Sequence, residues 1–301
     1  MLTRRTFLAA LPLAPVALSA QTGPKRIGFV DDDLDNYHAR VFLEAFRGPL
    51  KDRGWVVAGA TALQHDKSRA WAARHDLPYY DDPAALAPHV DAFAVLAPST
   101  PGTHEPLCAK VLPAGKPTFV DKTFAPDAAA AERIFALADR HGAPIQTSSA
   151  LRYTAVQAFV AAAGPEAVRH VTTWGPGRSY DEYAIHPLEL AVSCLGPEAL
   201  AVRRRGTGAL SQLQIDFSGG RTAVVHVCTA SKTPYAASVA TPKETRYIEV
   251  DTKPLFRDAA AAMLGFFEAR RAQVDRRETM AILRILDASR DPAAHEGGVK
   301  L

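Results

Sequence analysis

Three polar segments in the first half of the chain carry side chains that could bind a ligand or exchange a proton. They are Asp31 to Asp33, Pro98 to His104 and Asp121 to Thr123. Each follows an apolar run typical of a buried strand, in turn KRIGFV, DAFAVLA and PTFV. Because an open parallel sheet binds its ligands beyond the carboxyl ends of its strands, we expect these segments to meet at one edge.

A fourth segment, GRSYDEYAIHPLELAVSCLG, supplies acid–base groups from the second half of the chain. Glu182, His186 and Glu189 are spaced i, i+4 and i+7, which predicts that they share one face of a helix. Histidine suits a group that takes a proton from an alcohol, because its pKa lies closest to neutral. Taken alone, His186 is equally compatible with a histidine satisfied inside the core, and Lys122 with a surface lysine after a strand.

The two halves of the chain differ in the spacing of their apolar residues. From 25 to 150 the apolar runs KRIGFV, WVVAGA, DAFAVLAP, PTFVD and PIQTS alternate with helix-length stretches. This alternation predicts parallel strands with crossover helices, and thus a Rossmann-like, doubly wound α/β domain. The clearest helix is expected over about 127–141, with Asp127 at its start and Gly142 just past its end.

After residue 150 the period of the apolar residues changes. ALSQLQIDF and RTAVVHVCTA alternate apolar and polar residues on either side of Ser218 to Gly220, which predicts an antiparallel hairpin with one buried face. RYIEVD offers another strand, and helices are expected over about 256–273 and 276–289. The region 151–301 is therefore predicted to be an α+β domain with a mainly antiparallel open sheet.

Segments of both halves resemble the Gfo/Idh/MocA family of oxidoreductases. In VDAFAVLAPSTPGTHEPLCAKVLPAGKPTFVDKTFA, a strand ends in a proline-containing loop, a histidine opens the next helix, and A-G-K leads to a lysine placed like that of the family's E-K-P motif. SSALRYTAVQAF is similar to the family's Arg-aromatic crossover into the second domain, and DEYAIHPLELAVSCLG to its catalytic-helix pattern. The resemblance covers roughly residues 25 to 290.

The resemblance implies an NAD- or NADP-dependent dehydrogenase that acts on a hydroxyl of a small carbohydrate or cyclitol. In it, Lys122 takes the place of the E-K-P lysine, His186 that of the acid–base histidine, and Glu182 that of the acid four residues earlier. Proteins of this kind commonly pack the open sheet face against another copy. The residues expected at the cofactor are Asp31, Asp32, Asp33, Pro98, Ser99 and His104, and those at the substrate are Arg152, Tyr153 and Tyr183.

The cofactor end departs from the family pattern. The fingerprint G-x-G-x-x-G is absent, and Asp31 and Asp33 stand where its first two glycines would be. At ~4 Å and an effective dielectric of 20, each carboxylate–phosphate pair would cost on the order of 4 kcal/mol before screening. The aspartates could instead cap a helix. They could also hold a hard cation or a sugar hydroxyl, with Tyr37 and His38 as neighbours.

Two further functions therefore stay open beside the oxidoreductase. One is a carbohydrate-binding protein on the same fold that uses no nicotinamide. The other is a non-redox lyase or hydrolase that uses the same residues, with a cation at the aspartates. Fold alone does not separate these functions, because function belongs to the site.

The first twenty residues, MLTRRTFLAALPLAPVALSA, predict a twin-arginine signal peptide. Arg4 and Arg5 precede a short apolar run that Pro12 and Pro15 interrupt, so it is too broken to span a bilayer. The protein is thus expected to meet the twin-arginine export machinery and to be periplasmic or secreted, with no membrane segment in its mature chain.

A formal charge of +3 without a long basic run argues against nucleic acid as a partner. Three cysteines without C-x-x-C spacing indicate buried side chains rather than a zinc site.

Overall fold

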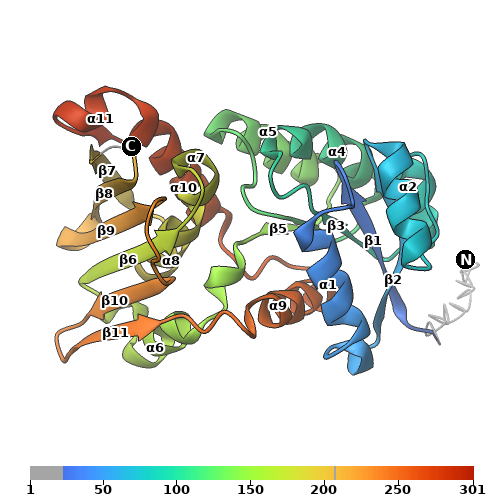
Figure 1. Ribbon diagram of the computed structural model, residues 1–301, viewed down its shortest axis with the longest axis horizontal. Coiled ribbons are helices and arrows are strands. Elements are labelled where there is room, and N and C mark those ends of the chain that lie inside the picture. The colour runs from blue at the N-terminus through green and yellow to red at the C-terminus, as the bar shows by residue number, and fades with distance from the viewer. Residues whose placement is uncertain (1–22, 207) are drawn as a thin grey trace, which may run out of the picture.

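The structure is a computed structural model that describes residues 23–206 and 208–301. The predicted signal peptide lies outside these residues. The described chain forms two lobes, each built on its own sheet (Figure 1). None of the helices in the described ranges is long and apolar enough to cross a membrane.

The first lobe contains a parallel sheet with strand order β2-β1-β3-β4-β5. Apart from the first residues of β1 and the first half of the edge strand β2, where Val56 is exposed, its short apolar strands are buried on both faces. This explains why they read as continuous runs rather than as alternating patterns. The strands are β1 (Lys25–Asp31), β2 (Trp55–Ala62), β3 (Ala92–Val95), β4 (Thr118–Val120) and β5 (Ile145–Thr147).

Helices cover both faces of this sheet, as a doubly wound fold requires. The helix predicted from about 127 to 141 is confirmed, because the Asp127 side chain accepts a hydrogen bond from Ala130 N and caps it. The helices of this lobe are α1 (Tyr37–Arg47), α2 (His65–Arg74), α3 (Pro83–Leu86), α4 (His104–Val111) and α5 (Ala128–Arg140).

The second lobe contains a seven-stranded sheet with order β11-β10-β6-β9-β8-β7-β12. All neighbours are antiparallel except β6 and β9. The predicted hairpin is confirmed as β8 and β9, and alternate side chains of β8 are buried. The strands are β6 (His170–Pro176), β7 (Ala199–Arg205), β8 (Leu210–Phe217), β9 (Arg221–Cys228), β10 (Ala236–Ala240), β11 (Thr245–Glu249) and β12 (Val299–Lys300).

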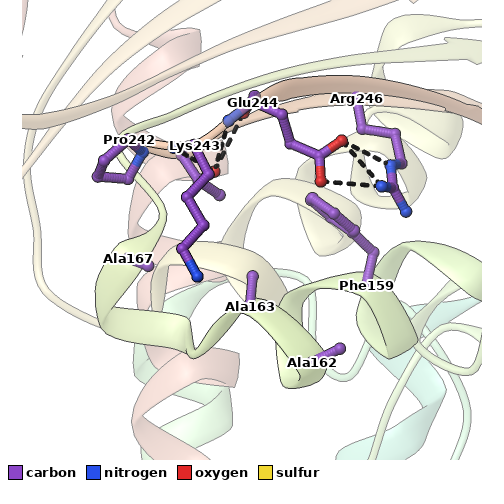
Figure 2. Close-up of a pocket in the computed structure, with 9 residues that line it drawn as sticks. Phe159, Ala162, Ala163, Ala167, Pro242, Lys243, Glu244 and Arg246 are labelled. Carbon is purple, nitrogen blue, oxygen red and sulfur yellow. Dashed lines mark hydrogen bonds and ion pairs between the residues drawn. The ribbon is translucent and has the colours of Figure 1, made fainter.

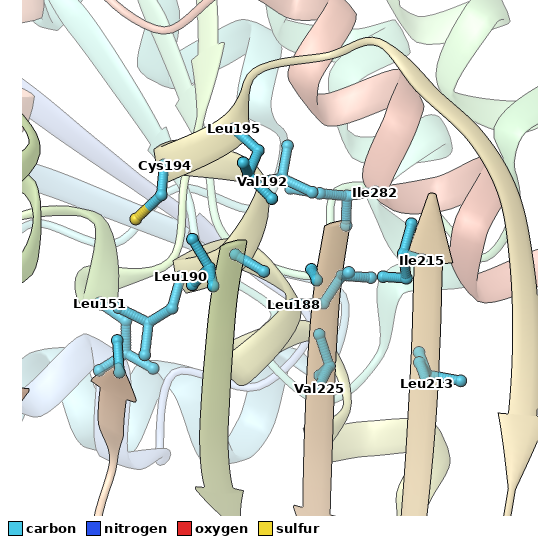
Figure 3. Packing of buried hydrophobic residues seen from close by; sticks show 14 of the residues in the cluster. Leu151, Leu188, Leu190, Val192, Cys194, Leu195, Leu213, Ile215, Val225 and Ile282 are labelled. Atoms are coloured by element: carbon cyan, nitrogen blue, oxygen red, sulfur yellow. The ribbon is translucent and has the colours of Figure 1, made fainter. Parts of the chain in front are cut away.

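One face of this second sheet packs against helices. Side chains of α8 (Ile185–Leu195) lie against those of β8 and β9, as Leu188 and Val225 show (Figure 3). The remaining helices are α6 (Ala155–Ala163), α7 (Tyr180–Tyr183), α9 (Leu255–Ala269), α10 (Arg276–Arg290) and α11 (Ala293–Glu296). The three cysteines are buried and unpaired, in agreement with the prediction.

The C-terminal helices connect the lobes. Although α9 follows the second sheet in sequence, it lies beside α1 (Figure 1). Its Met263 and Phe266 belong to the same buried cluster as Phe42 of α1. Next, α10 packs between α5, α8 and β7. The first lobe is therefore completed by residues from beyond 150, and the chain crosses between the lobes more than once.

Candidate functional site

The end of β4 carries the lysine predicted for catalysis. Asp121 N continues the strand ladder by donating to Val95 O, and the next side chain, Lys122, is buried except for 7% of its surface. Lys122 Nζ donates to Pro98 O at 3.0 Å, so the loop after β3 fixes the ammonium group. The peptide between Lys122 and Thr123 is cis. The ends of β3 and β4 thus meet at one edge, as predicted.

His186 reaches the same region from the second lobe. Its Nδ1 lies 3.1 Å from Ser149 Oγ, and its ring lies between those of Tyr183 and Tyr235, with both centroids at 5.8 Å. Burial, followed by the positive charges of Lys122 and His38, lowers the pKa of His186 to about 3. The imidazole is therefore neutral at physiological pH and able to accept a proton.

Two glycines allow the helical segment with His186 to approach β6 closely. A Cβ atom at Gly175 would lie 2.6 Å from Pro187 Cδ, and one at Gly177 would overlap Tyr183. The absence of side chains at both positions lets α7 and α8 fold directly over the strand. The sequence carries this signal as the tripeptide G-P-G just before the segment that contains His186.

The prediction that Glu182, His186 and Glu189 share one face of a single helix is wrong. Glu182 belongs to the short α7, and α8 begins only at Ile185. The Glu182 carboxylate is the acceptor for Ser99 Oγ at 3.4 Å, a contact between the lobes. Glu189 is buried and points to Arg152, so it is removed from the His186 ring.

The residues predicted at the substrate differ in accessibility. Arg152 donates from Nε to Glu189 at 2.7 Å and from Nη1 to Glu278 at 2.5 Å, with 11% of its side chain exposed. It thus ties α8 to α10. The hydroxyl of Tyr153 contacts Ser148 Oγ at 2.9 Å. Among these predicted residues only Tyr183 lies against the His186 ring.

A histidine that the sequence placed only as a neighbour of the aspartates joins this site. His38 Nδ1, in the first turn of α1, lies 2.5 Å from Asp121 Oδ2. Burial by itself raises the pKa of Asp121, but His38 and Lys122 outweigh it and hold that pKa below its usual range. Asp121 is therefore a buried carboxylate next to Lys122, in contact with the imidazole of His38 on α1.

Asp31, the first aspartate of the turn after β1, is buried and hydrogen-bonded within the first lobe. Asp31 is 1% exposed and accepts hydrogen bonds from Asp32 N, Ala97 N and Asn36 Nδ2 at 2.8–3.0 Å. Burial raises the pKa of Asp31 to about 8, against these three hydrogen bonds. Asn36, rather than an aspartate, caps α1 by accepting from Ala39 N. Helix capping by the aspartates, one interpretation of the sequence, is therefore wrong for α1.

His104 is a buried structural residue at the same edge of the sheet. It is fully buried, with Nδ1 3.0 Å from Phe124 O and Nε2 within 3.2 Å of Leu96 O and Ala97 O. The ring connects the loops after β3 and β4 and presents no nitrogen to the surface. It supports the cofactor edge from inside instead of contacting a ligand there.

The described ranges contain no group of three or more His, Cys, Asp or Glu side chains arranged to hold a metal ion. A hollow of about 340 Å³ lies elsewhere, between α6 and the β10–β11 turn (Figure 2). It is lined by Phe159, three alanines and Lys243, and it contains none of the predicted site residues. The side chains at the ends of β4 and α8 thus remain the candidate site.

The arrangement defines a class: a Rossmann-type domain joined to an α+β domain. Lys122 comes from the first and His186 from the second, and both lie at the edge where the parallel strands end. Residues 36–149 match the model of the Gfo/Idh/MocA family, which is described as an oxidoreductase family with an NAD-binding Rossmann fold. This match covers the first lobe except β1, the turn after it and α9, and supports a Gfo/Idh/MocA-type Rossmann domain. No curated protein matches the sequence.

Solved structures share the fold over both lobes. A probable dehydrogenase from Thermotoga maritima has a TM-score of 0.78 and 15% identity, covering 91% of this chain and 98% of its own. GenD2 from gentamicin A biosynthesis, solved with NAD, has a TM-score of 0.75 and 17% identity, with coverages of 97% and 99%. A putative myo-inositol dehydrogenase from Sinorhizobium meliloti 1021 has a TM-score of 0.74 and 15% identity, with coverages of 92% and 99%.

Proposed function

We propose that the protein oxidises or reduces a hydroxyl-bearing carbon of a sugar or cyclitol with NAD or NADP. One observation carries the proposal: Lys122 from the first lobe and His186 from the second are held at the same edge of the parallel sheet, Lys122 by Pro98 O after β3 and His186 by Ser149 Oγ after β5. The family description and the dehydrogenases of similar fold support it.

The chain's own groups supply the proton chemistry. His186 takes the proton of the reacting hydroxyl, since Ser149 holds Nδ1 and leaves the other ring nitrogen for the substrate. The low pKa of His186 makes it a weak base, so the transfer depends on a positive group that lowers the pKa of the hydroxyl. The Lys122 ammonium polarises the same oxygen and stabilises the negative charge that develops on it. Tyr183, beside the His186 ring, lines the substrate side. A bound nicotinamide nucleotide supplies the acceptor or donor of the hydride.

The turn after β1 fits an anion at the start of α1 better than its sequence suggests. Asp31 is turned inward, Asp33 lies 3.8 Å from Lys67, and Asp35 lies 3.1 Å from Arg74. The Asn36 cap takes only Ala39 N, so the N–H groups of the first helical turn remain at the positive end of the helix dipole. These N–H groups and the loop of Pro98 and Ser99 would hold the nucleotide.

One observation favours the nicotinamide-free carbohydrate-binding alternative. Three N–H groups of the turn are already satisfied within the chain: Asp32 N by Asp31, Leu34 N by Ser68, and Asp35 N by Asp33. These groups are not available to a pyrophosphate. Nucleotide binding therefore distinguishes the oxidoreductase from the carbohydrate-binding protein.

The first experiment tests nucleotide binding directly. Purified protein is denatured and its ultraviolet spectrum recorded for released nucleotide, and native protein is heated with NAD(H), NADP(H) or neither. Released nucleotide, or a rise of several degrees in Tm, is expected, because a ligand of the folded state stabilises it. Neither signal, with stabilisation by a polyol alone, would transfer the protein to the carbohydrate-binding class.

The second experiment tests the two catalytic side chains on a panel of sugars and cyclitols. Lys122→Met and His186→Gln should each lower kcat/KM by about 10² to 10⁴ without unfolding the protein. Surface variants serve as matched controls: Lys110→Met and His65→Gln replace the same residue types on exposed positions. Equal activity of the site variants and their controls would remove Lys122 and His186 from the mechanism.

We also infer export through the twin-arginine pathway, which rests on the leader sequence alone. Replacing Arg4 and Arg5 with lysine should retain the protein inside the cell, as measured by fractionation. Unchanged export of this double variant would refute the inference.

Association of two copies through the open face of the seven-stranded sheet likewise stays a prediction, to be checked by the mass of the native protein in solution.

A further inference from the structure

Two residues of α8, one turn apart, are hydrogen-bonded to the crossover segment, residues 149–152, by which the chain enters the second lobe. His186 and Glu189 are spaced i and i+3, so they lie on the same side of the helix. Ser149 Oγ lies 3.1 Å from His186 Nδ1, and Arg152 Nε donates to Glu189 Oε1 at 2.7 Å. Ser149 and Arg152 belong to one tight turn, because Arg152 N donates to Ser149 O at 3.1 Å. The crossover segment therefore holds α8 at two neighbouring points.

Ser149 connects these two points. Its backbone N–H donates to the Glu189 carboxylate, while its side chain contacts the His186 ring. Its hydroxyl also accepts from Leu151 N at 3.3 Å, which caps the turn. Ser149 is 1% exposed and Glu189 4%, so water has little access to compete for these hydrogen bonds. A displacement of Glu189 is thus passed to the serine that contacts the histidine.

Arg152 fixes Glu189 against a third element. Its Nη1 donates to Glu278 of α10 at 2.5 Å, and its side chain is largely buried. The guanidinium thus lies between two carboxylates from different helices. Because a buried charge without a partner is unfavourable, either carboxylate can be removed singly while the other still compensates Arg152.

Another side of α8 is held by apolar packing. Leu188 and Val192 belong to the core that the helix forms with the second sheet (Figure 3). Apolar contacts have no fixed direction, whereas hydrogen bonds weaken steeply when their geometry changes. The rotation of α8 about its axis, and with it the place of the His186 ring, therefore depends on the hydrogen bonds to the crossover segment.

We propose that Glu189 and Arg152 are positioning residues of the site. By fixing Ser149 against α8, they hold the His186 ring where it can meet the substrate. Neither side chain has to touch a ligand for this role, so Arg152, which the sequence places at the substrate, acts through α8 instead. The effect on turnover rests on the proposed function, whereas the contact between Ser149 and His186 can be measured without substrate.

The test compares two variants that differ in which carboxylate Arg152 loses. Glu189→Ala frees Ser149 from α8, whereas Glu278→Ala frees Arg152 from α10 and leaves the contacts of Ser149 in place. Both variants should fold, because Arg152 keeps one carboxylate in each, and a cooperative thermal transition would show this. Glu189→Leu, which fills more of the vacated space, replaces Glu189→Ala if the latter does not fold.

The first readout is the ¹⁵N spectrum of the histidine rings in the full protein at constant pH, without substrate. The signals of His186 are identified by their loss in His186→Gln, and Ser149→Ala gives the shift that follows loss of the hydroxyl contact. We expect Glu189→Ala to move the His186 Nδ1 signal in the same direction as Ser149→Ala, and Glu278→Ala to leave it in place. An unmoved signal in Glu189→Ala, or an equal movement in Glu278→Ala, would overturn the proposal.

The second readout is kinetic and uses a sugar or cyclitol that the native protein accepts. Glu189→Ala should lower kcat by about 10- to 100-fold with KM within about twofold, because a displaced base slows the chemical step without changing uniform binding. Glu189→Gln keeps an oxygen that can accept from Arg152 and Ser149, so it should recover most of that loss. Glu278→Ala should keep kcat within about twofold of the native value. Equal kcat values for Glu189→Ala and Glu278→Ala would mean that the network only supports the fold.

The two readouts separate this proposal from the proposed function. A His186 signal that moves as expected, in a protein that oxidises no polyol, would refute the oxidoreductase and support the role of Glu189 and Arg152. An active protein in which Glu189→Ala changes neither the signal nor kcat would do the reverse.

Discussion

The turn after β1, the end of β4 and the start of α8 meet at one edge. Their ionisable side chains differ in how far hydrogen bonds within the protein already satisfy them. Asp31 accepts three hydrogen bonds from its own lobe and is closed off from solvent. Lys122 and His186 have one hydrogen-bond partner each, Pro98 O and Ser149 Oγ, among the described residues. A carboxylate in the place of a fingerprint glycine has become part of the scaffold, whereas the other two groups keep donor or acceptor capacity for a ligand.

The largest effect that would test this difference is on folding stability. Asp31→Ala removes the acceptor of one buried donor, Ala97 N, and of two partly buried donors, Asp32 N and Asn36 Nδ2. We therefore expect the free energy of unfolding to fall by about 2–4 kcal/mol, measured by urea denaturation. His186→Gln should change it far less at pH 7, because the histidine is already neutral there.

The matched control is Asp35→Ala in the same turn. Asp35 is exposed, and its pairing with Arg74 is an ordinary surface ion pair, so its removal should change stability by less than about 1 kcal/mol. Equal losses in Asp31→Ala and Asp35→Ala would contradict a structural role specific to Asp31.

The pH dependence of stability should have opposite signs in the two regions. The pKa of Asp31 is raised to about 8, above its unfolded value of 3.8, so the folded protein binds the extra proton and its stability falls as pH rises toward 8. The pKa of His186 is lowered to about 3 from 6.5, so the unfolded chain binds the extra proton and stability falls as pH drops below 6.5.

Each of these changes should amount to about 2 kcal/mol over 1.5 pH units. Below pH 6.5 the slopes of the two groups oppose each other, so the stability of the native protein, measured by denaturation, should be nearly flat from pH 4.5 to 6.5 and decline from 6.5 to 8. Asp31→Asn should lose the alkaline decline and show an acid one, whereas His186→Gln should lose stability with rising pH over the whole range. If either variant kept the slope of the native protein, the group concerned would not be the one that titrates.

The sequence predicted the elements better than the contacts of the site. Periodicity was sufficient for the parallel strands and for the β8–β9 hairpin, since these patterns report which faces are buried. It could not show that α9 returns to the first lobe, because an apolar helix face does not identify its partner. Nor could it show that Asp31 turns inward or that His38 meets Asp121, because these contacts join residues 66 and 83 positions apart along the chain.

The smallest effect concerns Glu182, which the family pattern placed in the catalytic group. The residue lies on α7 rather than on the helix of His186, and its contact with Ser99 is long, at 3.4 Å, and exposed. A carboxylate in this setting helps to hold the two lobes together but is poorly placed to share the proton of His186. We therefore expect Glu182→Gln to lower kcat/KM less than about tenfold, against the 10² to 10⁴ expected for His186→Gln. Stability should stay within about 0.5 kcal/mol of the native protein, as for most surface changes.

Ser99→Ala should have a similar effect, and the double variant should lose no more activity than either single one, because both remove the same contact. A loss in Glu182→Gln as large as in His186→Gln would place Glu182 among the reacting groups, and the lobes would then have to close further around the substrate than they do here.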